Sequence, residues 1–172
     1  MRQIAHFLDN KIDQLGFVVG DVKQTIKNYY HSFGIANWHL YTYGPPLLTM
    51  MQYHGKPFEY KARIALSYLG QTRIEIIENL EGDTIYTDFI AKHGYGLQHL
   101  GIYVNDIEKA LEEAKKAGFS VIMEGGGFGL DGDGYFAYLD TENEFGISYE
   151  LIQRPLRRHE PEEIYPPLIN KE

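Results

Sequence analysis

The sequence contains an internal repeat. Residues 12–22 read IDQLGFVVGDV, and residues 97–107, 85 positions later, read LQHLGIYVNDI. A second pair of matching segments, IEII at 74–77 and YELI at 149–152, lies at the end of each copy. Self-similarity of this kind predicts a duplicated structural unit whose two copies pack together. It constrains the possible folds more than any other feature of the chain.

Four side chains that can bind a metal ion occupy equivalent positions in the two copies. Gln14 aligns with His99, and Glu75 aligns with Glu150. Each copy therefore contributes two potential ligands. Pairing of the copies about a pseudo-twofold axis would bring all four to one metal site.

Each copy opens with a strand followed by a helix. Apolar residues recur at every second position of the opening segment, as expected when one strand face packs on a helix and the other lines a different space. Asp21 and Asp106 stand at N-cap positions, where a carboxylate accepts hydrogen bonds from free backbone N–H groups. Gly34 and Gly118 stand where a left-handed residue ends a helix.

The remaining pattern predicts three more strands in each copy, at residues 38–43, 60–69 and 72–78, and at 120–124, 134–139 and 146–153. The predicted fold class is α+β: two βαβββ modules, residues 11–80 and 96–153, paired into an eight-stranded open cup with helices outside. Residues 44–59 read as a long hairpin loop, and the proline-rich residues 154–172 as an extended tail.

Composition limits the possible functions. The chain has 172 residues, no cysteine and a net charge of −8. The charge disfavours nucleic acid as a partner, because neutralising phosphates requires a basic face. No run of about 18 apolar residues occurs, so we expect a soluble cytoplasmic protein that does not bind membranes.

Apolar residues at both ends of the chain have no place in the repeat. They include Ile4, Phe7 and Leu8 near the start, and Ile164–Ile169 in the tail. Each module also leaves one edge strand unpaired, and exposed edges favour association. We therefore expect a homodimer, with the alternative that both segments fold back on their own chain.

The four aligned residues have less specific explanations as well. A single histidine on a strand is most often a structural hydrogen-bonding residue, and Gln14 alone would be an ordinary surface residue. A glutamate inside an apolar strand is harder to explain, because burying an unpaired carboxylate is costly. Glu75 and Glu150 both have this setting. An amide, an imidazole and two carboxylates suit a divalent ion that keeps open water positions.

At these residues the chain resembles the vicinal oxygen chelate superfamily, which includes glyoxalase I, methylmalonyl-CoA epimerase, extradiol dioxygenases and the bleomycin resistance proteins. The resemblance covers about residues 11–153 and is carried by the paired strand–Asp–helix openings, by GLQHLG at 96–101 and by YELI at 149–152. It implies that Gln14, Glu75, His99 and Glu150 bind a divalent ion such as Zn, Co, Ni or Mn.

The layout looks most like the methylmalonyl-CoA epimerase branch, which implies removal of a proton next to a carbonyl group and stabilisation of an enolate. Glu150 is then the first candidate base, as a ligand that can detach. Glu59 is the second, because it stands where the epimerase pattern carries a catalytic glutamate. The implied substrate is an acyl-CoA or a thiol adduct. Lys56, Lys61 and Arg63 are candidates for binding coenzyme A at the rim of the cup.

Two alternatives stay open. Epimerases usually carry His at the position of Gln14 and often Gln at that of Glu75, and the set Gln, Glu, His, Glu is instead like that of eukaryotic-type glyoxalase I. A lactoylglutathione lyase is therefore the second enzymatic interpretation. The third is a non-catalytic protein that sequesters a small molecule in the same cup, as bleomycin resistance proteins do.

Overall fold

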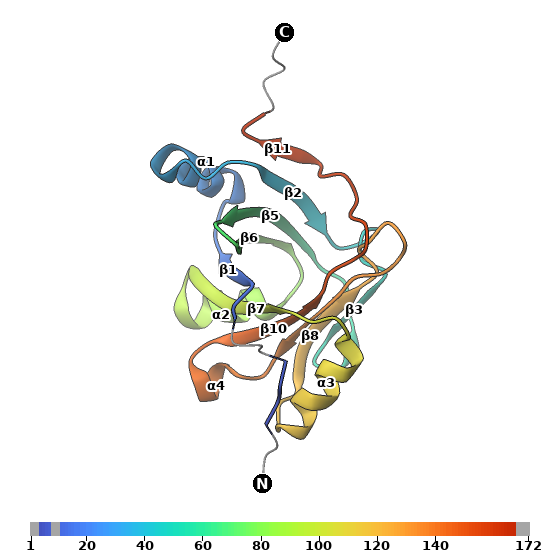
Figure 1. The fold of residues 1–172 in the computed structure, drawn as a ribbon. Helices are drawn as coiled ribbons and strands as arrows, with labels where there is room; N and C mark the ends of the chain where they lie inside the picture. Colours follow the sequence, from blue (N-terminus) through green and yellow to red (C-terminus); the bar gives the residue numbers. More distant parts are fainter. Residues whose placement is uncertain (1–3, 8–10, 168–172) are drawn as a thin grey trace.

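The structure is a computed structural model that describes residues 4–7 and 11–167. In this part of the chain, eleven strands form one curled sheet accompanied by four helices (Figure 1). The strands are β1 (Gln14–Val18), β2 (Trp38–Tyr43), β3 (Met50–Tyr53), β4 (Lys56–Pro57), β5 (Lys61–Leu69), β6 (Thr72–Glu81), β7 (Gly96–Tyr103), β8 (Val121–Gly126), β9 (Tyr135–Leu139), β10 (Ser148–Gln153) and β11 (Glu163–Tyr165). The helices are α1 (Val22–Phe33), α2 (Ile85–His93), α3 (Ile107–Lys116) and α4 (Glu142–Phe145).

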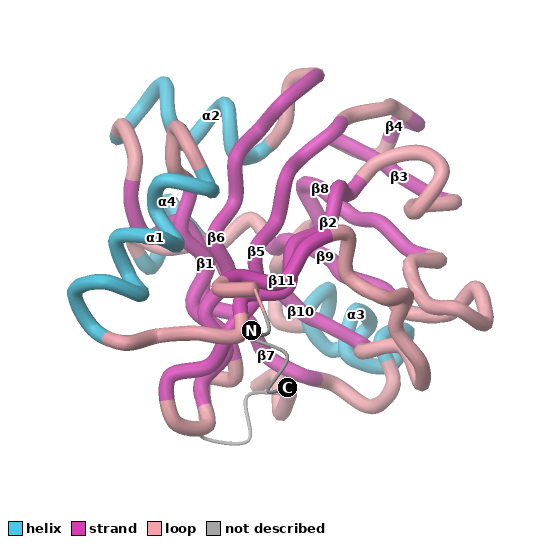
Figure 2. Tube along the Cα trace, turned by 90° about the horizontal axis from the view of Figure 1, so that it is seen from above, coloured by secondary structure: helices cyan, strands magenta, loops and turns pink. Residues whose placement is uncertain are grey.

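Two four-stranded groups meet at the centre of the sheet. The strand order is β11-β2-β5-β6-β1-β7-β10-β9-β8-β3-β4, and β1 pairs with β7 in antiparallel fashion. The strands β2, β5, β6 and β1 come from the first copy of the repeat, and β7, β10, β9 and β8 come from the second. Seen from above, the sheet curls around an interior (Figure 2). The predicted α+β cup is confirmed.

Three short strands extend the predicted eight. The segment predicted as a loop at 44–59 contains the β3–β4 hairpin, which adds to β8 of the other module through the pair Met50 and Gly126. The tail forms β11, which adds to β2 through the pair Ile164 and His39. Unpaired backbone groups at the edges of the sheet explain both additions, because each strand supplies the missing hydrogen-bond partners.

The helices α1 and α3 pack on the outer face, each over its own module, in clusters around Ile26 and Ala114 respectively. Their predicted caps are confirmed. The carboxylate of Asp21 accepts a hydrogen bond from the backbone N–H of Gln24, and that of Asp106 accepts one from Lys109. Such caps satisfy donors that the first turn of a helix leaves free. The two openings of the repeat are therefore built by the same local rules.

Helix α2, which the sequence pattern did not reveal, joins the two modules. It begins after Thr84, whose side chain accepts hydrogen bonds from the backbone N–H groups of Tyr86 and Thr87. Ile85 and Tyr86 are buried in a cluster with inward-facing side chains of both modules, including Tyr138. Aromatic side chains thus fill much of the cup.

The apolar ends of the chain fold back where the structure describes them. Phe7 packs beside the outer cluster around α3, and Ile164 belongs to β11 on β2. Leu8, Leu168 and Ile169 lie outside the described residues. Because the chain itself covers both former edges, the argument for a dimer from unpaired edges no longer holds, and the homodimer stays a prediction. In the described ranges, no helix is both long and apolar enough to cross a membrane.

The two outer clusters should contribute comparably to stability. Ile76 and Leu151 are fully buried at matching positions of β6 and β10. We expect Ile76→Ala and Leu151→Ala each to lower the free energy of unfolding by about 2–5 kcal/mol, because each leaves a cavity in a packed core. Urea denaturation measures this. Leu156→Ala is the control, since Leu156 is 89% exposed and its loss should cost less than about 0.5 kcal/mol. A large loss from only one core variant would contradict equivalent clusters.

Candidate metal centre

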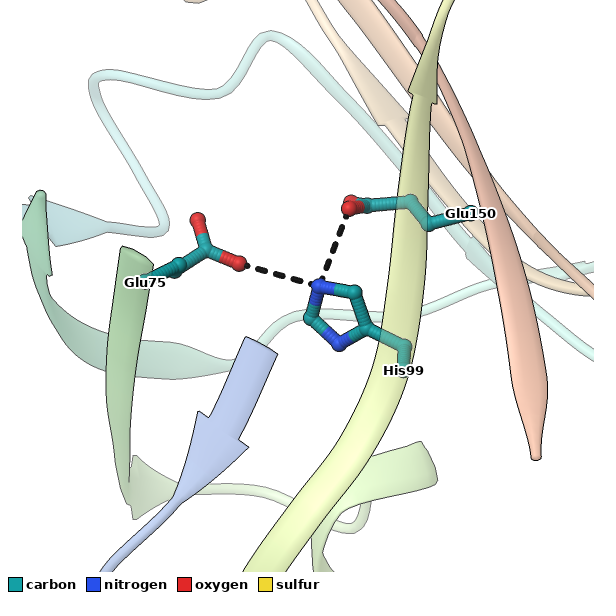
Figure 3. A group of neighbouring side chains, drawn as sticks. All are labelled: Glu75, His99 and Glu150. Atoms are coloured by element: carbon teal, nitrogen blue, oxygen red, sulfur yellow. Dashed lines mark ion pairs between the residues drawn. The ribbon is translucent and has the colours of Figure 1, made fainter. Parts of the chain in front are cut away.

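The structure brings three of the four predicted ligands into one buried group. Glu75 on β6, His99 on β7 and Glu150 on β10 point toward one another (Figure 3). Their potential ligand atoms all lie within 4.8 Å of one another. The Nε2 atom of His99 lies 3.3 Å from Oε2 of Glu75 and 3.1 Å from Oε2 of Glu150. None of the three is more than 6% exposed. We call these three residues the Glu–His–Glu group.

Strand pairing explains why residues so far apart in sequence meet. The antiparallel pairing of β1 with β7 places Gln14 opposite Gly101, and Gly16 opposite His99. The parallel strand β6 places Glu75 beside Gly16 on one flank, and β10 places Glu150 beside Gly101 on the other. Residues paired across neighbouring strands project from the same face of the sheet. All four predicted ligands therefore point into the cup.

Two glycines at equivalent positions of the repeat make room for the ligands. A Cβ atom on Gly16 would lie 1.8 Å from Cε1 of His99, and one on Gly101 would lie 2.8 Å from Cβ of Gln14. Contacts below about 3 Å do not occur between such atoms, so any larger residue would displace the ligand. Each module thus provides a ligand and a space for the ligand of the other module. The repeated glycine was visible in the sequence, but its role follows only from the strand register.

Gln14 lies among the three ligands but presents its nitrogen to them. Its Nε2 donates hydrogen bonds to Glu75 (3.0 Å) and Glu150 (2.9 Å) and lies 3.2 Å from Nε2 of His99. Its Oε1 accepts a hydrogen bond from Nε of Arg73. A guanidinium can only donate, so Arg73 determines which way the amide points. Gln14 would have to turn over and release Arg73 to act as a metal ligand.

The imidazole of His99 is oriented by its neighbour Gln98. Oε1 of Gln98 lies 2.8 Å from Nδ1 of His99, and Gln98 is 1% exposed. The amide oxygen accepts, so Nδ1 carries the hydrogen and Nε2 faces the carboxylates. In the neutral ring this arrangement leaves the Nε2 lone pair free for a metal ion. Gln98 was not among the residues predicted from the sequence, since a glutamine next to a histidine gives no distinctive pattern.

The group carries negative charge in a buried place. Burial raises the pKa of Glu150, and the nearby His99 lowers it by a smaller amount. Burial lowers the pKa of His99, but the carboxylates of Glu150 and Glu75 raise it by more in sum, to about 9. His99 therefore keeps its proton at neutral pH in the presence of the two carboxylates, unless another cation replaces that proton. These residues fit a divalent ion in both donor type and charge.

Neutral phenols surround the group on the interior side. The ring of Tyr138 lies edge-on to that of His99, with centroids 5.1 Å apart, and its hydroxyl lies 2.9 Å from the hydroxyl of Tyr86. Burial raises the pKa of both tyrosines well above the usual value, so both stay protonated. They exclude bulk water, which strengthens electrostatic interactions within the group.

Other residues predicted to act at the site lie elsewhere. Glu59 is exposed between β4 and β5 and does not belong to the Glu–His–Glu group. Lys56 is exposed, and Lys61 forms a salt bridge of 2.9 Å with Glu81. Arg63 alternates with the inward residues of β5, so its side chain is directed to the outer face. Binding of coenzyme A by these three cations at the rim of the cup stays a prediction.

Comparison with known proteins identifies the family. Residues 13–138 match the family model described as the Glyoxalase/Bleomycin resistance protein/Dioxygenase superfamily. The chain belongs to this superfamily. The matched region includes Gln14, Glu75 and His99, three of the four ligands predicted from the sequence. The resemblance noted in the sequence is confirmed, and the curled sheet is the expected fold.

Several proteins are similar to this chain in sequence or in fold. The uncharacterized protein YqjC of Bacillus subtilis (strain 168) is 23% identical over 154 residues, which are 90% of this chain and 99% of that protein. A hypothetical protein from Bacillus halodurans C-125 has a TM-score of 0.60 at 25% identity, covering 87% of this chain and 97% of its own. Methylmalonyl-CoA epimerase from Mycobacterium tuberculosis has a TM-score of 0.61 at 18% identity, covering 88% and 93%.

Filling the space at Gly16 should disturb His99 specifically. We expect Gly16→Ala to weaken binding of Zn²⁺ by about 10- to 100-fold, because the added methyl group occupies the position of the imidazole. Isothermal titration calorimetry measures the affinity, and circular dichroism checks the fold. Gly20→Ala is the matched control, since its Cβ would meet only the ring of Tyr95, which is 64% exposed and able to move. Equal affinities in both variants would contradict the role given to Gly16.

Metal binding should release a proton from His99. Metal ions bind only the neutral imidazole, whereas the pKa of about 9 keeps His99 protonated at neutral pH in the metal-free protein. Apparent affinity for Zn²⁺ should therefore increase with pH and level off above about pH 9. Titrations in buffers of different ionisation enthalpy count the protons released. Release that is unchanged in His99→Gln would show that the proton comes from elsewhere, and His93→Gln is the control at an exposed histidine.

Proposed function

We propose that this protein is a metal-dependent isomerase that removes a proton next to a carbonyl group, with methylmalonyl-CoA epimerase activity as the first candidate. The observation that carries the proposal is the buried Glu–His–Glu group, built from equivalent strands of both modules. The fold shared with methylmalonyl-CoA epimerases supports the general architecture. The substrate would be an acyl-CoA or a related thioester.

Glu75, His99 and Glu150 would hold the ion, with Gln14 joining them if its amide turns over. A divalent ion bound there would act as a Lewis acid on a carbonyl oxygen of the substrate. Glu150 is the proposed base. Its Oε2 lies 3.1 Å from Nε2 of His99, and burial raises the pKa of Glu150, so it accepts a proton more readily than an exposed carboxylate does. Tyr86 and Tyr138 would exclude water from the reacting atoms.

Inversion of a carbon centre requires a second proton carrier on the opposite face of the substrate. Glu59 remains the proposed second base, from an exposed position preceding β5. Glu59 is exposed and does not belong to the Glu–His–Glu group. It is therefore tested separately from Glu150.

The second candidate is a lactoylglutathione lyase like glyoxalase I. The combination of Gln14, Glu75, His99 and Glu150 around one point favours it, since this set matches the one implied for that enzyme. Both reactions begin with removal of a proton next to a carbonyl group. The third possibility, sequestration of a small molecule without turnover, requires no base.

A paired assay separates these functions. We expect the protein, supplemented in turn with Zn²⁺, Co²⁺, Ni²⁺ and Mn²⁺, to exchange the α-proton of methylmalonyl-CoA with D₂O. The same preparations are tested on the glutathione–methylglyoxal hemithioacetal. Turnover of only the hemithioacetal would select the lyase. Turnover of neither substrate would remove both enzymatic proposals, and tight ligand binding by the metal-free protein would then favour sequestration.

Variants assign the two bases. Glu150→Gln should lower exchange by about 10²–10⁴-fold, because a general base is lost. Glu59→Gln should keep exchange for one epimer of the substrate while losing inversion. Glu112→Gln, at an exposed helical site 74% accessible, is the control. Metal content is measured in every variant, so that loss of the ion is not mistaken for loss of the base. Unchanged inversion in Glu59→Gln would exclude Glu59.

A further inference from the structure

A cavity of about 330 Å³ lies on the inner side of the first module, and Arg73 in its wall contacts Gln14 of the candidate site. Its walls include His39 and Tyr41 of β2, Leu66 of β5 and Arg73 of β6. Tyr41 and Leu66 also belong to the cluster that fills the cup, which places the cavity on the concave face. Leu66 on β5 pairs directly with Glu75 on β6, so one wall of the cavity lies on the strand next to that of a proposed ligand.

Arg73 lines this cavity and contacts Gln14 and Tyr103. It is 5% exposed, its Nε donates to Oε1 of Gln14, and its guanidinium carbon lies 5.1 Å from the centroid of the Tyr103 ring. It forms no ion pair with any carboxylate in residues 4–7 and 11–167. A charged guanidinium that is buried without an ion-pair partner is costly, and Gln14 occupies only one of its donors.

Arg158 supplies a second cation from the C-terminal tail. The tail passes over the cup, where Arg158 forms a β-bridge with Gly129. Its Nη1 donates to the hydroxyl of Tyr43 at 3.3 Å, and its guanidinium lies 5.7 Å from the ring of Phe128. It too has no ion-pair partner in the described part of the chain. Two arginines thus line one small cavity without a carboxylate between them.

We propose that this cavity binds a carboxylate or phosphate group of the substrate between Arg73 and Arg158. Guanidinium groups bind both oxyanions through paired hydrogen bonds, and their fixed geometry suits a planar or tetrahedral anion. The volume lies within the range of small-molecule pockets, so an anionic group of a substrate fits. The inference deepens the proposed function. It defines the substrate as an anionic compound whose charged end sits beside Arg73, with its reacting carbon toward Glu75 and Glu150.

Anion binding can be measured without turnover. The full chain is stripped of metal with a chelator and titrated calorimetrically with malonate, inorganic phosphate and the neutral analogue malonamide. We expect one or both anions to bind and malonamide not to bind. Arg158→Gln should weaken binding of the anion about tenfold or more, because one charged donor pair is lost. Arg157→Gln is the control, since the neighbouring Arg157 pairs with Asp131 at the surface. Arg73→Lys is the second test variant, because it keeps the charge at that position but removes the fork geometry.

The outcomes separate the two sources of the anion and the two proposals. Tighter binding of malonate assigns a carboxylate to the cavity, and tighter binding of phosphate assigns a phosphoryl group. The inference is overturned if neither anion binds, or if Arg158→Gln binds as tightly as Arg157→Gln. Anion binding without α-proton exchange would remove the proposed isomerase while leaving the cavity as an anion site. Exchange of the α-proton without anion binding would remove the anion site while leaving the proposed isomerase.

Discussion

The antiparallel pairing of β1 with β7 is the contact on which the candidate site depends. These strands come from different copies of the repeat, and their register places Gln14 opposite Gly101 and Gly16 opposite His99. A bulky side chain at either glycine would collide with the facing residue. A shift of one residue would turn both ligands to the outer face, because side chains alternate along a strand. The candidate metal site and the junction between modules are therefore the same structural feature.

Electrostatics links this junction to the cavity beside it. The Glu–His–Glu group concentrates negative charge inside the cup, while Arg73 places a positive charge two residues before Glu75 on β6, opposite Gln14. Gln14 connects the two, with its nitrogen on the carboxylates and its oxygen on Arg73. Arg73 also lowers the pKa of Glu150, against the larger effect of burial. A cation in the group and an anion beside Arg73 would each compensate a charge that the fold buries.

The segments outside the repeat complete the cup. The β3–β4 hairpin of the first module covers the edge of the second at β8, and β11 of the tail covers the edge of the first at β2. Glu162 in the tail also accepts hydrogen bonds from the backbone N–H and the hydroxyl of Thr42. The tail is thus tied along the sheet, and this places Arg158 at the cavity. A segment that the repeat does not explain contributes directly to the proposed anion site.

The sequence by itself determined the features that arise from local chemistry and from the repeat. Alternation along β1 and β7 identified the inward-facing ligands, and Asp21 and Asp106 marked the helix starts, because strand period and helix capping depend on neighbours a few residues away. The spacing of Gln14, Glu75, His99 and Glu150 predicted one shared site because the two copies had to pair. The sequence also indicated that Arg73 lies near the site, because it stands two positions before Glu75 and both must face the same side of β6.

Only the tertiary structure decided which distant segments meet. It showed that Ile85 and Tyr86 of α2 are buried in the inner cluster, that the hairpin crosses to the other module, and that Arg158 lines the same cavity as Arg73, 85 positions earlier in the chain. It also showed that Arg73 turns the amide of Gln14 so that nitrogen, rather than oxygen, faces the carboxylates. These outcomes depend on packing and hydrogen bonding between residues that are far apart in sequence. The spacing of residues along the sequence does not predict such contacts, because their energies arise only when the complete sheet has formed.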